Sequence, residues 1–213
     1  GLKWTPLQSM HQRYANTFLP LNFKINLDDF VNYSKININQ HNYKFSTKNK
    51  LLGIAPFAGH ICKEYSIENI LSFVNLLDES YEILIFGAPG HEEQKIIELC
   101  ENKKNRHVIS SNYSLKEQMA IMSNLDVMIS MDSANGHIAS LFGTEVITIW
   151  GATHPYAGYS PFNQPNENSI IPNLNKFPDL PVTIYGSNCP TNYLEVINSI
   201  KVERILKRLN QII

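Results

Sequence analysis

Asp132, Ser133 and His137 stand close together in the run MDSANGHIASLF, between two apolar segments of the chain. A helix that begins at this junction would offer unpaired backbone N–H groups and a partial positive charge, which together suit a phosphate group. Ser133, Ala134 and Gly136 are small enough to let a ligand approach that backbone closely. His137 lies about one turn into the helix, where it can donate to a phosphate oxygen. The residue types therefore indicate an anion-binding junction.

A simpler interpretation of the same residues needs no ligand. Asp132 or Ser133 can serve as the N-cap of the helix, and His137 can be a partly buried histidine. Asp132 would also repel a phosphate placed directly against it, so its expected partners are ligand hydroxyls or the N–H groups of the turn. Taken alone, this run supports both interpretations equally.

Two other loops carry charged residues that could complete a nucleotide site. Lys63, in FAGHICKEYS, can pair with phosphates, although a single lysine is more often a solvated surface charge. Glu92 and Glu93, in GAPGHEE, can bind the hydroxyls of a ribose if they follow a strand, and acids at a helix start also favour its dipole without any ligand. The chain contains neither GxGxxG nor GxxxxGK[ST], which disfavours NAD-type and P-loop sites.

A regular alternation of apolar runs and amphipathic segments positions these residues. Strands are predicted at 51–55, 82–86, 106–110, 126–131 and 145–150, and helices at 66–79, 91–102, 114–124 and 134–142. Ser66 is a candidate N-cap, and Ser114 with Glu117 has the spacing of a capping box. The alternation predicts an α/β fold, a Rossmann-like parallel sheet with helices on both faces. Ligands of such sheets bind at the carboxyl ends of the strands, where all three candidate loops lie.

The first fifty residues have a different character. Segments 10–23 and 27–36 are predicted to form short amphipathic helices, and 37–50 is polar and typical of a linker. The chain opens with glycine and its first methionine is Met10, so position 1 is not expected to be a natural start.

Composition excludes several function classes. The 213 residues carry a net charge of −1, which gives no electrostatic reason to expect nucleic acid or an anionic membrane as a partner. No apolar run approaches the length of a transmembrane segment. Three widely spaced cysteines suggest neither a disulfide framework nor a zinc site. We therefore expect a cytoplasmic protein without a transmembrane segment, and leave open a peripheral position at the inner membrane.

Four segments, GIAPFAGHICKEYS, ILIFGAPGHEE, MDSANGHIASLFGTEVITIWGATHP and IYGSNCP, together resemble the carboxyl-terminal half of the lipopolysaccharide heptosyltransferases, glycosyltransferase family 9. That family shows a strand, D-[ST]-G-x-x-H, a helix, a second strand and an F-G-x-T-x-P loop. Asp132, Ser133 and His137 match the motif, and Thr153 with its flanking Gly and Pro matches the loop. The resemblance runs from about Leu51 to the end of the chain.

Two residues depart from the family pattern. Ala134 stands where the family usually has glycine, and it allows close backbone approach but not easily a positive φ angle. Trp150 replaces the usual phenylalanine, which is a mild change.

The resemblance implies a role for each candidate residue. Lys63 and the backbone from Ala134 through Asn135 and Gly136 to His137 would hold the diphosphate of a nucleotide sugar. Glu92 would bind the ribose, with Glu93 as the alternative. Asp132 would hold sugar hydroxyls, and Ser133 and Thr153 would complete the substrate site.

The resemblance also implies an overall activity. The fold would be similar to the carboxyl-terminal domain of a GT-B glycosyltransferase, and the donor would be a nucleotide-linked heptose, usually ADP-heptose, transferred with inversion to the lipopolysaccharide core. The absence of a DxD triplet agrees with transfer that needs no metal, in which protein cations and a helix dipole stabilise the leaving diphosphate. No cofactor is implied.

The family's proposed general base, an aspartate near the start of the amino-terminal domain, has no matching segment in this chain, so the catalytic residues stay unassigned. His154 could reach into the cleft, but we do not assign it as the base. We divide the chain into 1–48, the tail of an amino-terminal domain with its linker, and 49–213, the donor-binding domain. The acceptor would bind the missing domain, so we expect the 213 residues alone to transfer no sugar, whether they are an excised fragment or a naturally short protein.

Two alternative functions remain. A GT-B or epimerase-type enzyme that uses a UDP-sugar would share the sheet and the phosphate site at the helix terminus. A non-catalytic nucleotide-sugar-binding module would show the same donor loops.

Overall fold

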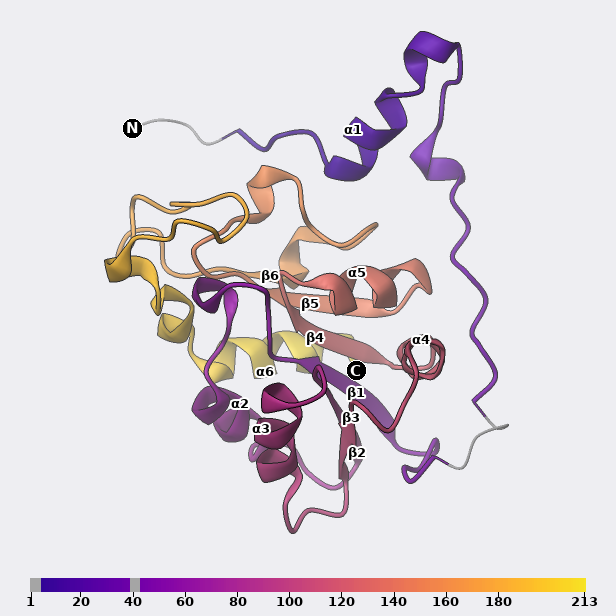
Figure 1. The fold of residues 1–213 in the computed structure, drawn as a ribbon, viewed down its shortest axis with the longest axis vertical. Coiled ribbons are helices and arrows are strands. Elements are labelled where there is room, and N and C mark those ends of the chain that lie inside the picture. The colour runs from indigo at the N-terminus through magenta and orange to yellow at the C-terminus, as the bar shows by residue number, and fades with distance from the viewer. Residues whose placement is uncertain (1–4, 39–42) are drawn as a thin grey trace.

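The computed structural model describes residues 5–38 and 43–213, which contain a six-stranded, entirely parallel sheet in the order β3-β2-β1-β4-β5-β6 (Figure 1). The strands are β1 (Lys50–Ala55), β2 (Tyr81–Phe86), β3 (Arg106–Ile109), β4 (Val127–Met131), β5 (Glu145–Ile149) and the two-residue β6 (Ser169–Ile170). The strand order reverses between the neighbours β1 and β4, which is the position where doubly wound sheets bind ligands. The predicted Rossmann-like α/β fold is confirmed.

Helices cover both faces of the sheet because successive residues of each strand point in opposite directions. Their bounds are α2 (Ile67–Val74), α3 (His91–Cys100), α4 (Leu115–Met122), α5 (Ala134–Leu141) and α6 (Val202–Ile212). In β1, Leu52 and Ile54 pack into the core beneath α2, α3 and α6, whereas Leu51 and Ala55 pack with α4 and α5. The strands are buried on both sides, in agreement with their almost uninterrupted apolar sequence.

Side-chain caps fix the starts of two helices as the sequence predicts. The Ser66 side chain accepts from the backbone N–H of Asn69 at the start of α2. Ser114 and Glu117 form a reciprocal capping box at α4. Sequence reasoning missed α6, whose buried Ile205 and Leu209 close the core beside α2, and the short edge strand β6.

The segment ahead of the sheet forms less helix than its sequence predicts. Helix α1 (Met10–Asn16) ends well before residue 23 and is followed by a single 3₁₀ turn at Leu19–Leu21, which contains Pro20. The helix predicted at 27–36 is wrong. Only Leu27–Asp29 forms a 3₁₀ turn, and the chain then runs extended because its backbone bonds to the α/β unit instead, with the N–H of Tyr33 donating to Leu141 O at 2.9 Å. Part of the linker predicted at 37–50 lies outside the described residues.

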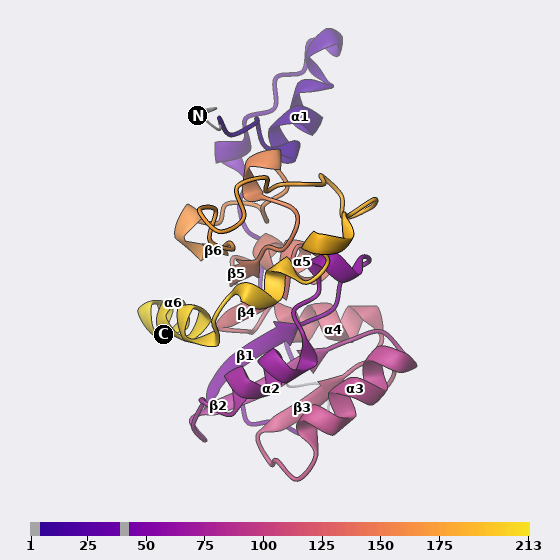
Figure 2. The same cartoon turned by 90° about the vertical axis from the view of Figure 1, so that its left-hand side faces the viewer.

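The α1 segment lies beyond the carboxyl end of the sheet, with the loops that follow β5 between them, as both views show (Figures 1 and 2). Backbone hydrogen bonds join the two parts: Leu7 donates to Tyr156 O and Met10 donates to Gly158 O. Within the described ranges, no helix is both long enough and apolar enough to span a bilayer.

Candidate functional site

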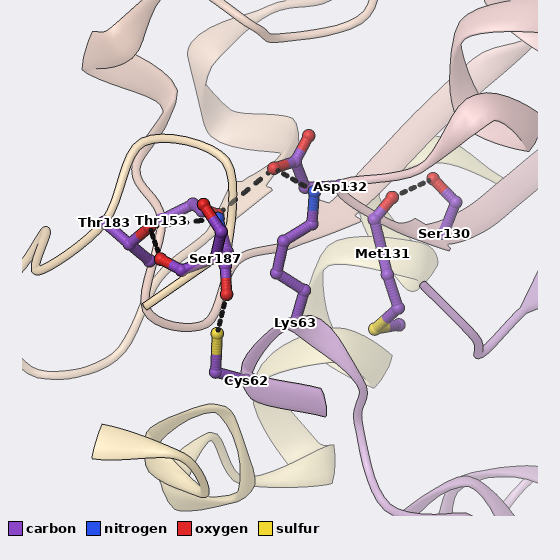
Figure 3. A network of polar contacts seen from close by, with 9 residues as sticks. Cys62, Lys63, Ser130, Met131, Asp132, Thr153, Thr183 and Ser187 are labelled. Carbon is purple, nitrogen blue, oxygen red and sulfur yellow. Dashed lines mark hydrogen bonds and ion pairs between the residues drawn. The ribbon is translucent and has the colours of Figure 1, made fainter. Parts of the chain in front are cut away.

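An ion pair joins the two loops at the reversal of strand order. Lys63 ends a 3₁₀ turn (Ile61–Lys63) that follows β1, and Asp132 directly follows β4. The Lys63 Nζ atom lies 2.9 Å from Asp132 Oδ2, with only 13% and 10% of the two side chains exposed (Figure 3). The lysine is therefore a largely buried partner of the aspartate rather than a solvated surface charge.

A third loop reaches the same carboxylate. Thr153, which is buried in the loop after β5, donates its hydroxyl to Asp132 Oδ2 at 3.2 Å. Lys63 therefore balances the charge of Asp132 beside the start of α5, which removes the main electrostatic objection to an anion at this edge.

The start of α5 is not capped by a side chain, although the sequence permitted that interpretation. Ser133 occupies the N-cap position, but it accepts no hydrogen bond from the helix. Its Oγ atom is buried and has no partner among the described residues. The Asp132 carboxylate is engaged by Lys63 and Thr153 instead. A buried hydroxyl without a partner costs free energy, so its presence at a helix N-terminus points to a bound group that completes it.

A cavity of about 450 Å³ opens directly onto this helix terminus. It is lined by the loop after β1, the loop after β2 and the first residues of α5. These are Phe57, Ala58, Gly59, Phe86, Gly87, Ala88, Pro89, Glu92, Gln118, Ser133, Ala134 and Asn135. The glycines and alanines among them leave backbone accessible, which is the lining that a phosphate-bearing ligand requires.

The two neighbouring glutamates point to different places. Glu92 lines the cavity, and its carboxylate accepts from the backbone N–H of Ala88 at 2.7 Å. Glu93 instead accepts from Ser111, from both its hydroxyl and its backbone N–H, and the hydroxyl bond lowers the pKa of that carboxyl below its ordinary value. The geometry therefore favours Glu92 as the residue that meets a ligand.

Gly136 and His137, the remaining motif residues, contact other parts of the chain. Gly136 faces β4, where a Cβ atom would lie 2.3 Å from Ser130 Oγ, so packing already requires a glycine there. Burial lowers the pKa of His137, while the neighbouring Asp132 carboxylate opposes that change. The His137 ring lies 6.4 Å from the ring of His11 in α1, a neighbour that no local sequence signal indicated.

His154 lies at a separate cavity of about 370 Å³, which it shares with Tyr156 and Leu180. Its Nδ1 atom accepts from the backbone N–H of Tyr156 at 3.1 Å, and burial lowers its pKa. The residue is therefore not part of the lining that contains Glu92 and Ser133.

The loop around residues 183–187 supports Lys63 from the far side. Gly186 has a φ angle of +96°, and a Cβ atom there would lie 2.8 Å from Lys63 Cδ. The Cys62 thiol donates to Gly186 O at 3.4 Å. A glycine at this position thus allows the loop to pack against the lysine stem.

The family model for glycosyltransferase family 9 (heptosyltransferase) matches residues 6–183. The chain belongs to glycosyltransferase family 9. The match begins well before Leu51 and ends thirty residues before the carboxyl terminus, so the resemblance covers more of the first segment and less of the end than the motifs indicated.

The chain is similar in sequence to bacterial lipopolysaccharide and lipooligosaccharide heptosyltransferases. The chain is 28% identical over 128 residues to the lipopolysaccharide core heptosyltransferase OpsX of Haemophilus influenzae, covering 55% of this chain and 36% of that protein. It is 23% identical over 168 residues to lipooligosaccharide heptosyltransferase 2 of Campylobacter jejuni, covering 76% of this chain and 51% of that protein. The chain therefore matches about a third of the length of the first relative and about half of the second.

Solved heptosyltransferases share the fold. E. coli heptosyltransferase WaaC with ADP superposes with a TM-score of 0.60 at 16% identity, over 79% of this chain and 46% of that one. E. coli ADP-heptose lps heptosyltransferase II covers 100% of this chain and 54% of its own, with a TM-score of 0.59 at 15% identity. The expectation of a GT-B-like fold is confirmed.

Proposed function

We propose that this member of family 9 forms the donor-binding half, residues 49–213, of a glycosyltransferase that moves heptose from ADP-heptose to the lipopolysaccharide core. One observation carries the proposal. One cavity is lined both by Glu92, in the first turn of α3, and by Ser133, the N-cap residue of α5, whose buried hydroxyl has no partner among the described residues. Asp132, the residue before Ser133, forms the ion pair with Lys63. The structure of E. coli heptosyltransferase WaaC with ADP, which shares this fold, adds support for the nucleotide.

The diphosphate fits at the start of α5. The unpaired N–H groups of the first turn and the helix dipole favour an anion there, and the Ser133 hydroxyl supplies a further donor. Lys63 has three ammonium hydrogens, of which the contact with Asp132 engages one, so two can bind phosphate oxygens. His137 stays neutral near pH 7 because burial lowers its pKa, and it donates through a ring N–H.

The nucleoside fits toward β2. Glu92 lines the cavity at the start of α3, where its carboxylate can accept hydrogen bonds from ribose hydroxyls. The Ala88 N–H holds the same carboxylate and fixes its direction. Asn135, at the other wall, lies on the α5 side of the cavity with the phosphates.

The sugar fits beside Asp132. Lys63 and Thr153 both contact Oδ2 of this carboxylate, and no contact of the described residues engages Oδ1, which is left to accept from a sugar hydroxyl. When the bond from the sugar to the diphosphate breaks, negative charge develops on the diphosphate. Lys63 and the α5 dipole stabilise that charge, so the proposed transfer needs no metal. We propose inversion of the transferred sugar on the family resemblance alone.

The general base belongs to the facing amino-terminal domain, and residues 1–48 form the tail of that domain and its linker. His154 is not assigned as the base because its Nδ1 atom already accepts from Tyr156 and its cavity is a different one. General-base catalysis contributes typically 10² to 10⁴-fold, and positioning contributes more, so the 213-residue chain alone should bind donor without transferring sugar.

Calorimetry with a nucleotide panel tests the proposal. The chain should bind ADP more tightly than UDP or GDP, with the same affinity in EDTA as in Mg²⁺. Preference for UDP would instead support a UDP-sugar enzyme. Failure of every nucleotide at millimolar concentration, or a strict need for Mg²⁺, would refute the site.

A further inference from the structure

Two tyrosines from distant loops meet close to the candidate donor site. The Tyr159 hydroxyl donates to the Tyr185 hydroxyl at 2.9 Å, and the rings pack edge to face with centroids 5.5 Å apart. Tyr185 remains 61% exposed. Its own hydroxyl hydrogen has no acceptor among the described residues, so it can donate outward. Tyr159 is half-buried, so the pair presents one exposed ring, one partly exposed ring and an outward hydroxyl donor, which suits an amphipathic ligand.

Helix α1 adds a cation to this pair. Arg13 donates to Ala157 O at 3.4 Å, which holds its guanidinium beside the segment that carries Tyr159 two residues later. The neighbouring Tyr14, on the same helix, is 65% exposed. We name Arg13, Tyr14, Tyr159 and Tyr185 the tyrosine cluster.

Three chain segments connect the tyrosine cluster to the donor site. Tyr185 directly precedes Gly186, which packs on the stem of Lys63. Tyr159 ends the loop that begins at Thr153, the hydroxyl partner of Asp132. The α1 helix that carries Arg13 also carries His11, whose ring faces His137. Each segment that carries a cluster residue therefore also carries another residue, Gly186, Thr153 or His11, that contacts the proposed site.

We propose that the tyrosine cluster binds a sugar ring of the acceptor saccharide and holds it beside the donor. This inference rests on the proposed function, because only a glycosyltransferase needs a second saccharide next to the nucleotide sugar. A sugar ring presents C–H groups on its faces and hydroxyls at its edge. The Tyr159 and Tyr185 rings pack against the C–H groups, and the tyrosine hydroxyls and the Arg13 guanidinium bind the edge. Acceptor binding would thus not be confined to a facing domain.

Saturation-transfer NMR and calorimetry on the 213-residue chain test this inference. The probe is a de-acylated Kdo–lipid A oligosaccharide, added to chain already saturated with ADP. We expect transfer to the sugar C–H protons, and Tyr185→Ala and Tyr159→Ala should each weaken saccharide binding about three- to tenfold. Tyr185→Phe, which keeps the ring, should lose less. ADP affinity should not change in any of these variants.

Tyr33→Ala is the matched control, because Tyr33 is 59% exposed but lies on the extended segment against Phe142, outside the tyrosine cluster. It should leave saccharide binding unchanged. The inference would be overturned if the chain binds ADP but not the saccharide, or if the tyrosine variants bind the saccharide as well as the parent does. Neither result would contradict the proposed donor site. A dimer in solution that Tyr185→Ala dissociates would also overturn it, since a second copy would then cover the rings. Failure of ADP binding would instead refute the proposed function.

Discussion

Lys63 and Asp132 lie at the carboxyl ends of the two strands between which the strand order reverses, and their side chains form a largely buried ion pair of 2.9 Å. Thr153 binds the same carboxylate oxygen from a third loop. Lys63 cancels the charge of Asp132, so this carboxylate adds no net negative charge beside a bound diphosphate. Because Lys63 neutralises Asp132, the aspartate in the MDSANGH run does not argue against an anion site at the start of α5.

Removal of the Lys63 ammonium group should weaken nucleotide binding selectively. A charge-assisted hydrogen bond contributes about 1.5 to 3 kcal/mol, so Lys63→Ala should lower ADP affinity by about 10- to 100-fold while adenosine binds as before. Calorimetry with both ligands measures the difference. Lys176→Ala, a change of the same charge outside the site, is the control, and equal ADP affinity in parent and Lys63→Ala would refute the phosphate contact.

The same substitution should destabilise the chain, because it leaves the Asp132 carboxylate buried without its cation. The double variant Lys63→Ala with Asp132→Asn removes that charge and should recover part of the lost stability. Thermal unfolding without ligand measures both effects. A double variant no more stable than Lys63→Ala would argue against the ion pair.

Ser133→Ala should separate stability from binding. Its hydroxyl is buried without a partner in the ligand-free chain, so its removal should leave the free energy of unfolding unchanged or raise it slightly. Binding of ADP should weaken, because one hydrogen bond of about 0.5 to 1.5 kcal/mol is lost, which is about two- to tenfold in affinity. Urea unfolding and calorimetry measure the two quantities. A loss of stability with unchanged affinity would show that the hydroxyl is structural.

Glu92 and Glu93 should differ in their response to the ribose. The parent should bind ADP more tightly than 2′-deoxy-ADP, since Glu92 accepts from the ribose hydroxyls. Glu92→Gln should reduce that discrimination, whereas Glu93→Gln should preserve it, because Glu93 binds Ser111. The ratio of the two dissociation constants is the measurement. If only Glu93→Gln lost the preference for ADP over 2′-deoxy-ADP, Glu93 rather than Glu92 would be the residue that binds the ribose.

Acid should destabilise the chain partly through His137. Burial lowers its pKa from the ordinary value of 6.5, so the unfolded chain takes up a proton at a higher pH than the folded chain does. Stability is therefore full above pH 6.5 and falls as the pH drops below it. The urea midpoint should decrease from pH 7 to pH 5.5, and His137→Gln should reduce this decrease. Because burial also lowers the pKa of His11 and His154, part of the decrease should remain in the variant. An identical decrease in parent and variant would show that His137 does not contribute.

The local sequence was sufficient to predict the sheet and the edge where the site lies. Apolar runs of strand length alternate with capped amphipathic segments, and parallel strands bring every following loop to the same end. Lys63, Glu92 and Asp132 could be placed at that end for this reason alone. The cap at Ser66 and the capping box at Ser114 were predictable because they depend on residues three apart.

Contacts between distant segments were decided only by the tertiary structure. Neighbouring Glu92 and Glu93 have the same local sequence signal, and only Ser111, on the next loop, distinguishes them. Ser133 has the residue type of an N-cap, but its side chain accepts no hydrogen bond from the N–H groups of the helix. The segment at 27–36 has a helical pattern, but it stays extended because its backbone N–H groups find acceptors on the α/β unit. The spacing of apolar residues along a helix or strand predicts which face is buried. Loops have no such repeating pattern, so the sequence does not predict the direction of a charged loop side chain or the pairing of Tyr159 with Tyr185.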